Sequence, residues 1–558
     1  MTQEPQRPRR TCWGRVLDAS TSTWDRDDAY PIERLFAFSE YCQSTPVWRV
    51  ALVLLLTCAT PLVLLVFFDS LPLRPPSEGW SASGFFFLRN FLGAHVIAGG
   101  ILVQIQTLVL DQPLSRKKII FIMCVVSIGH TSTLVLVAKY WAFPIPFMST
   151  LGNLPFTVFL NVSMLLAIGT KDRQVLAKIT KFNNIIAVQT TMLLVYPGFN
   201  AIFLKLDHLS QIALAGLLPI IKVSYKYVVA KVSSDLGDLS PAIIASVDLF
   251  DALYTTKCMQ SASSFWVGFA IILFDVVQNC IAIASLSKQF HVLRRADNSI
   301  ANRNTSQLLL LIPRLVTKKQ LLLTAGSIRV SSRNTLKLSP QAQAKVDLLR
   351  ALQSVEAELT MDSTSTGAKK HSNRTVVPLE TVSASAQPSS AAKLIPDIVS
   401  ATPVSVAARS GTRKSPSHLI RNAARLLHQS ESVVLVEYIE TAVPVFYAIY
   451  LLILVHLPNA KYYPEMQHLL GDADQLQRVV VNILLFACLE LLSLVFVNEA
   501  LKRTFGFSAF YQLAFTLESE WYIYQSNFIS WILMIFPFLL LHNGSDFTFE
   551  FKWLKQKS

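Results

Sequence analysis

Charged residues are scarce in this 558-residue chain, because only 15% are Asp, Glu, Lys or Arg while 52% are hydrophobic. The apolar residues fall in long blocks and show neither strand alternation nor the one-sided stripe of a surface helix. A block of roughly 20 apolar residues is long enough to cross a bilayer as a helix. The composition excludes an ordinary water-soluble protein and predicts an all-α, polytopic membrane protein with about ten to eleven transmembrane helices.

Motifs of common enzymes are also missing. The chain has no Gly-rich phosphate loop, no HExxH and no GxSxG, so we expect no enzymatic activity. Its seven cysteines form no CxxC pair and predict no disulfide framework; those inside apolar spans are expected to be buried packing residues: Cys58, Cys124, Cys280 and Cys488. His95 and His130 fall near mid-depth of consecutive spans and could ligate a haem, but separate packing roles are favoured. We therefore expect no cofactor and no bound metal.

Ten apolar spans are expected, and the first is uncleaved because no signal peptide precedes it. They are Val47 to Phe68, Phe85 to Leu110, Ile119 to Ala138, Phe147 to Thr170, Ile185 to Leu206, Leu209 to Val223, Phe265 to Ser287, Val433 to Leu457, Val479 to Leu501 and Asn527 to His542. The domains are then an N-terminal tail (1–46), a first helix group (47–287), a long loop (288–432), a second helix group (433–545) and a C-terminal tail (546–558).

Basic residues in short loops indicate which loops face the cytoplasm. Three basic groups mark inner loops and place the N-terminal tail in the cytoplasm: Arg116, Lys117 and Lys118; Lys171, Arg173, Lys178 and Lys181; and Lys222, Lys226 and Lys231. The span Phe265 to Ser287 would then begin and end on the inner side, although a single crossing must have its two ends on opposite sides. Either Pro241 to Tyr254 crosses or re-enters the membrane despite Asp248 and Asp251, or the long loop is external. We favour the cytoplasmic loop.

The long loop holds most of the surplus positive charge. From Lys288 to Ser432 there are 21 Lys and Arg against 8 Asp and Glu, a surplus of 13 beside the chain's net charge of +14. The net positive charge of the chain therefore lies mainly in this one loop, which predicts contact with anionic lipid and not with nucleic acid. Few aromatic residues occur there, so we expect most of the loop to be disordered.

Three helical islands interrupt this loop: Leu308 to Leu323, Pro340 to Met361 with Ser339 as N-cap, and Pro416 to His428. Ser332 and Ser415 resemble basic-directed and proline-directed phosphorylation sites, although any Ser-rich basic segment contains such strings. Sequons at Asn304, Asn373 and Asn543 can be glycosylated only on the luminal side, so they test the topology.

Two segments are expected at the membrane surface. Pro31 to Tyr41 either forms an interfacial helix with Leu35, Phe36 and Phe38 toward lipid or remains a solvated tail. Phe505 to Tyr524 is dense in aromatic residues, which is typical of a helix at headgroup level. Arg89 is expected to extend to the outer interface. The small residues from Gly93 to Gly100 predict close helix contact.

Carboxylates inside apolar spans are the strongest candidates for a functional site, because an ionised group in hydrocarbon is costly. Glu437 and Glu440 lie in one span, Glu490 lies in the next at similar depth, and Asp275 lies near the middle of an earlier span. Carboxylates, with the carbonyl of Glu440 freed by Pro444, suit a hard cation or a proton. The alternative is that these groups hydrogen-bond one another and fix helix packing.

Three strings carry a family resemblance: FDALYTTKCMQ (Phe250 to Gln260), HLPNAKYYP (His456 to Pro464) and LKRTFGFSAFYQLAFTLE (Leu501 to Glu518). In these strings, and in the spacing of Glu437, Glu440, Asn482 and Glu490, the chain resembles a group of uncharacterised multi-pass membrane proteins of oomycete genomes. The resemblance covers the membrane-embedded parts and implies no activity.

Two functions remain open from the sequence. The first is a proton- or cation-coupled transporter or channel-like protein that uses Asp275, Glu437, Glu440 and Glu490. The second is a membrane-anchored scaffold or sensor that acts through its basic, phosphorylatable loop. The sequence does not define a substrate or an oligomeric state.

Overall fold

The chain is an integral multi-pass membrane protein built from α-helices and short 3₁₀ turns in a computed structural model. The structure describes residues 30–110, 113–169, 173–233, 240–260, 265–296, 329–351 without 333–335 and 337, 416–547 and 551. Within those residues ten segments are long and apolar enough to span a membrane, which confirms the ten expected spans. They are α3 (Val47–Ser70), α4 (Gly84–Leu108), α5 (Arg116–Tyr140), α6 with α7 (Met148–Leu151 and Asn153–Ile168), α8 (Arg173–Phe203), α9 with α10 (His208–Ala215 and Leu218–Val232), α12 (Phe265–Ala296), α16 (Pro416–Leu454), α17 (Ala473–Phe505) and α19 (Trp521–Ile535) with the turn η7 (Phe536–Leu539).

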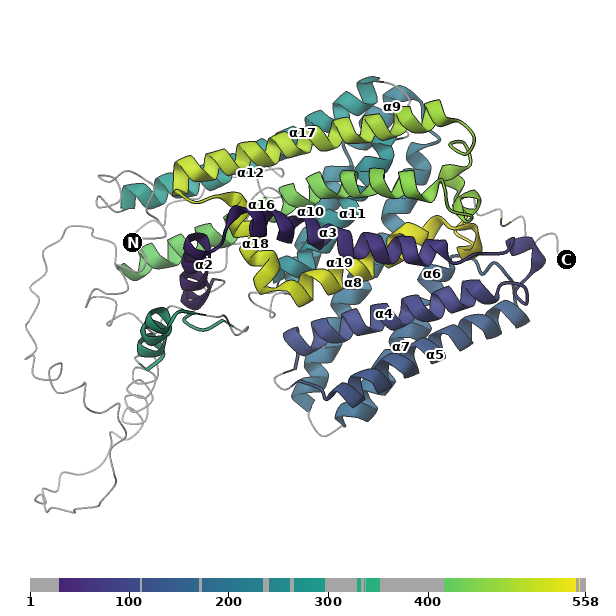
Figure 1. Ribbon diagram of the computed structural model, residues 1–558, viewed down its shortest axis with the longest axis horizontal. Coiled ribbons are helices and arrows are strands. Elements are labelled where there is room, and N and C mark those ends of the chain that lie inside the picture. The colour runs from purple at the N-terminus through teal and green to yellow at the C-terminus, as the bar shows by residue number, and fades with distance from the viewer. Residues whose placement is uncertain are drawn as a thin grey trace, which may run out of the picture.

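A further helix, α11 (Ser240–Gln260), lies in the middle of the bundle (Figure 1). It packs against α8, α10, α12, α16, α17 and α19. Every residue from 241 to 254 is buried, so this helix presents no face to lipid there. Surrounding helices therefore take the place of lipid, and α11 tolerates charges that a lipid-facing helix excludes.

The position of α11 favours the alternative in which Pro241 to Tyr254 crosses the membrane. The backbone N–H groups of Ile32 and Glu33 donate to the carbonyls of Arg329 and Val330, both at 3.1 Å, so these two segments lie on the same side. Seven of the ten candidate spans in the described part of the chain separate them, and an odd number would put them on opposite sides. With 21 residues α11 is about 30 Å long, enough for the eighth crossing.

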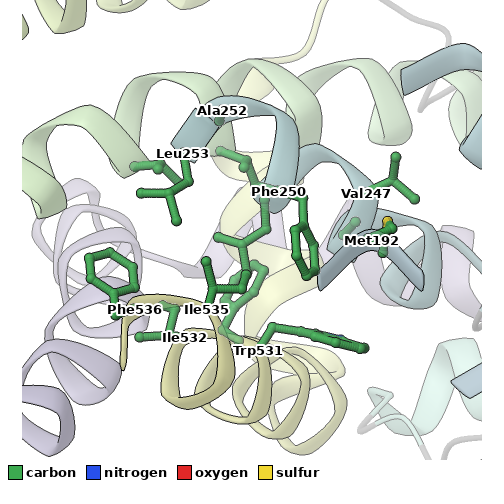
Figure 2. Packing of buried hydrophobic residues seen from close by; sticks show 14 of the residues in the cluster. Met192, Val247, Phe250, Ala252, Leu253, Trp531, Ile532, Ile535 and Phe536 are labelled. Atoms are coloured by element: carbon green, nitrogen blue, oxygen red, sulfur yellow. The ribbon is translucent and has the colours of Figure 1, made fainter. Parts of the chain in front are cut away.

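Apolar packing between α8, α11 and α19 forms the centre of the core (Figure 2). The ring of Phe250 meets that of Trp531 edge-on, with 5.4 Å between centroids. Met192 and Val247 lie beside this pair. Leu253 of α11 and Ile535 of α19 belong to the same apolar cluster. This packing fixes the rotation of α11 and hence the direction in which its polar residues point.

Glycines of α4 allow the expected close helix contacts on two sides. A Cβ at Gly99 would lie 2.9 Å from the methyl of Met123 on α5, and one at Gly100 would lie 2.6 Å from Ser530 Oγ on α19. Gly93 has nothing within 4 Å of such an atom, so it is not part of either contact.

The two segments expected at the membrane surface pack against each other. Helix α2 (Ile32–Ser44) packs on α18 (Ala509–Ser519), where Phe38 contacts Phe507 and Phe515 with ring centroids 5.5 Å apart. The prediction that Leu35, Phe36 and Phe38 face lipid was wrong, because all three side chains are buried. Sequence reasoning failed because aromatic residues are common both at interfaces and in tightly packed cores.

A buried arginine holds α2 in place. Arg34 donates to Glu431 on α16 at 2.6 Å and to Glu520, which lies between α18 and α19. All three side chains are at most 5% exposed. Burial lowers the pKa of Arg34, but Glu431 and Glu520 outweigh this and raise it above its ordinary value, so the guanidinium stays charged.

Other expectations about single residues are corrected. Cys280 and Cys488 lie on exposed helix surfaces and are not buried, whereas Cys58 and Cys124 are half-buried. Arg89 does not extend outward: its side chain is buried and pairs with Asp69 at 2.7 Å. Tyr450 and Tyr463 donate to the same carboxylate, so this arginine is fixed between α3, α4 and the η5 region (Ala460–Tyr462).

Gly544 follows directly after η8 (Leu541–Asn543) and has φ +57°. A Cβ there would clash with the Ile145 carbonyl, whose carbon would lie 2.8 Å away. We expect Gly544→Ala to lower the free energy of unfolding by more than about 1 kcal/mol, since backbone atoms must move. Gly84→Ala is the control, because Gly84 has open space around it. Equal thermal unfolding temperatures in detergent for both variants would contradict this expectation.

Candidate functional site

The strongest cluster of buried charges lies where α10, α11 and α16 meet. Lys222 on α10 forms ion pairs with Glu440 on α16 and with Asp251 on α11, the latter at 3.1 Å. Its Nζ is also 3.9 Å from Asp248, which pairs with Lys226 at 2.5 Å. The side chain of Lys222 and all three carboxylates are at most 8% exposed. We call these five residues the α11 charge cluster.

The α11 charge cluster is not neutral when all five groups are ionised, because three carboxylates face two ammonium groups. Glu440 Oε2 and Asp251 Oδ1 are buried and accept no hydrogen bond. An uncompensated carboxylate in a dry interior is costly, so such a site favours taking up one more positive charge. A proton on one of the carboxyl groups would remove the excess negative charge.

A cavity of about 190 Å³ adjoins the cluster between α10, α12 and α16. Its wall carries both lysines of the cluster, and Glu437 faces it from α16. The remaining polar lining consists of Gln278, Asn279, Ser285, Gln429 and Ser432. The cavity therefore offers two cations and several amide and hydroxyl groups next to the uncompensated carboxylates.

The other predicted site residues do not belong to the α11 charge cluster. Glu437 accepts a hydrogen bond of 2.7 Å from Ser493 on α17, so it points between α16 and α17 as well as lining the cavity. Glu490 is buried on α17, one turn before Ser493. Asp275 belongs to α12, but its side chain lies outside the described part of the structure.

Sequence reasoning found Glu440 but missed its partners. Lys222 and Lys226 were interpreted as markers of an inner loop, and Asp248 and Asp251 as obstacles to crossing. Both lysines instead lie within α10 and pair with α11. The available signal was their spacing: Lys222 with Lys226, and Asp248 with Asp251, share a helix face at four and three residues apart.

A second polar group lies further along α11. Lys257 pairs with Glu465 at 2.8 Å. The Tyr447 hydroxyl on α16 donates to Gln260 at 2.7 Å and lies 3.4 Å from Glu465. Lys257 is about 9 Å beyond Asp251 along the helix axis. Tyr254 lies between them, buried, with no hydrogen-bond partner for its hydroxyl. Polar side chains thus recur along α11 toward the opposite end of the bundle from α2.

The two histidines proposed as a haem pair have separate surroundings. His95 Nδ1 lies 3.2 Å from Ser127 Oγ, whereas the ring of His130 packs edge-on against Phe156. Within the described ranges, no group of three His, Cys, Asp or Glu side chains is arranged to hold a metal ion. In the α11 charge cluster the Lys222 ammonium lies among the carboxylates that a metal ion would need.

Of the two serines predicted as modification sites, only Ser332 lies in the described part of the chain. Its backbone N–H donates to the Glu33 carboxylate at 2.9 Å. Ser415 lies outside the described residues.

No protein family, curated protein or solved structure matches this chain.

Proposed function

We propose that this protein is a proton-coupled membrane transporter whose coupling site is the α11 charge cluster. The observation that supports it most is the charge imbalance: two ammonium groups face three carboxylates, deep within a bundle of membrane-spanning helices. Intramembrane ionisable residues of this kind are functional by default. The resemblance to the oomycete group supplies a lineage and no chemistry.

In the proposed cycle, Glu440 and the transported solute compete for the ammonium group of Lys222. When Glu440 is ionised, it holds Lys222 inside the cluster. When Glu440 takes up a proton, this attraction is lost. Lys222 then keeps only Asp251 and Asp248, so its ammonium is held less strongly and can pair with a solute in the cavity that it lines. A solute with an acidic or strongly polar group then binds beside Lys222 and Lys226. Proton uptake and solute binding are thereby linked through one side chain.

The test measures charge movement in proteoliposomes on a solid support after a step in pH, which requires no known solute. We expect a transient current from the wild type, and a current reduced to about a tenth or less in Glu440→Gln, because the neutral amide takes up no proton. This variant should fold, since Lys222 keeps Asp251 and Asp248 as partners.

Glu499→Gln is the matched control, because Glu499 is a half-exposed glutamate on α17 that pairs with Arg503. It should leave the current unchanged. Equal currents in Glu440→Gln and the wild type would exclude the cluster as the coupling site. We expect Glu490→Gln to reduce the current as well if Glu490 belongs to the same path.

The second candidate, a scaffold or sensor, is favoured by the contact between the long loop and α2. If this role is the correct one, deletion of Thr360 to Ser415 destroys function while Glu440→Gln does not. A wild-type protein without any pH-evoked current would support this candidate over the transporter.

A further inference from the structure

A short part of the long loop is docked on α2 at one end of the bundle (Figure 1). The N–H groups in the first turn of a helix have no partner within the helix. In α2 the carbonyls of Arg329 and Val330 accept two of them, from Ile32 and Glu33. A separate apolar cluster completes the contact: Ile32, Phe36, Val330, Ala342, Val346 and Leu349.

Ser339 is the polar link between the two segments. Its hydroxyl donates to Glu40 Oε1 at 2.5 Å, and its N–H donates to Glu40 Oε2 at 2.9 Å. The same hydroxyl accepts the Ala342 N–H at 3.3 Å, which confirms Ser339 as the N-cap of the helix over 340–351. The residue is exposed and is followed directly by Pro340.

We propose that Ser339 is a phosphorylation site and that its phosphorylation releases residues 329–332 and 338–351 from α2. A proline-directed protein kinase suits the Ser-Pro sequence, with ATP as the phosphoryl donor. The Ser339 oxygen forms a bond to the γ-phosphorus, the bond from that phosphorus to the β,γ-bridging oxygen breaks to give ADP, and the hydroxyl proton passes to solvent through the kinase. This inference does not depend on the transport function.

The electrostatic consequence follows from the contact with Glu40. Phosphorylation removes the hydroxyl donor and adds a charge of about −1.5 to −2 beside a carboxylate. A phosphate at the N-cap suits the helix over 340–351 itself, because the N-terminus carries the positive end of the dipole. What is lost is therefore the docking on α2. The carbonyls of Arg329 and Val330 then leave the first turn of that helix.

The experiment uses the full-length protein in lipid nanodiscs, treated with a purified proline-directed kinase and ATP. Mass spectrometry should locate one phosphate on Ser339. Hydrogen exchange at Ile32 and Glu33 should become about tenfold faster, because their N–H groups lose the carbonyls of Arg329 and Val330 as acceptors. Absence of phosphate on Ser339, or phosphate without faster exchange, would overturn the proposal.

Two variants separate charge repulsion from general disturbance. Ser339→Ala should show no kinase-dependent change in exchange. Glu40→Lys should convert the repulsion into an ion pair, so phosphorylation should leave exchange unchanged or slow it. The same acceleration in Glu40→Lys as in the wild type would refute Glu40 as the cause of release.

Discussion

Lys222→Met is expected to lower the free energy of unfolding by about 3–5 kcal/mol, the usual cost of leaving a buried ionic partner uncompensated. The change removes the shared cation of Asp251 and Glu440, both of which are buried. It leaves three carboxylates with Lys226 alone. The measurement is thermal unfolding of the purified protein in detergent.

A second variant tests whether charge is the cause. In Lys222→Met with Glu440→Gln, one carboxylate is neutralised together with the lysine, so a large part of the lost stability should return. Lys231→Met is the control on the same helix, because Lys231 is exposed and its loss should change stability by at most about 0.5 kcal/mol. If the double variant is no more stable than Lys222→Met, poor packing rather than charge explains the loss.

Arg34→Met should also cost about 3–5 kcal/mol, because it leaves Glu431 and Glu520 buried without their cation. We expect α2 to detach from α18, since Arg34 joins α2 to both α16 and the start of α19. Thermal unfolding gives the loss of stability, and hydrogen exchange of residues 32–44 shows whether α2 has been released.

Arg49→Met provides the comparison for Arg34. Arg49 pairs with Glu518, but the two side chains are 49% and 33% exposed. Solvent screens such a pair, so its loss should cost at most about 1 kcal/mol. Arg34→Lys should recover only part of the stability, because lysine cannot reach two carboxylates with a planar fork. Equal losses for Arg34→Met and Arg49→Met would show that burial does not control these ion pairs.

The membrane spans were predictable because lipid selects uninterrupted apolar runs, and ten such runs lie in the described part of the chain. Glu440 was predictable for the same reason, as a charge that interrupts such a run. Its contact with Lys222 was not, because a contact between α10 and α16 depends on how each helix is rotated in the bundle. The sequence of a single helix does not show which of its faces contacts another helix. Two lysines near the end of a span therefore have the same sequence pattern whether they face water or pair with aspartates.

The contact between α2 and the aromatic segment was not predictable for a similar reason. Phe507 and Phe515 are apolar groups that suit headgroups or a protein core equally well. Only the neighbouring α2, more than four hundred residues earlier in the chain, determines that they are buried.

The enclosure of α11 also has a consequence for how the protein is made. A segment carrying Asp248, Asp251 and Lys257 partitions poorly into lipid by itself, since each central charge adds about 2.5–3.5 kcal/mol to the insertion free energy. During synthesis Lys222 of α10 precedes it and can accompany the aspartates into the bilayer. Glu440 of α16 is made only after the long loop. Insertion of α11 is therefore expected to be cooperative with α10, and its final enclosure must wait until the last third of the chain has left the ribosome.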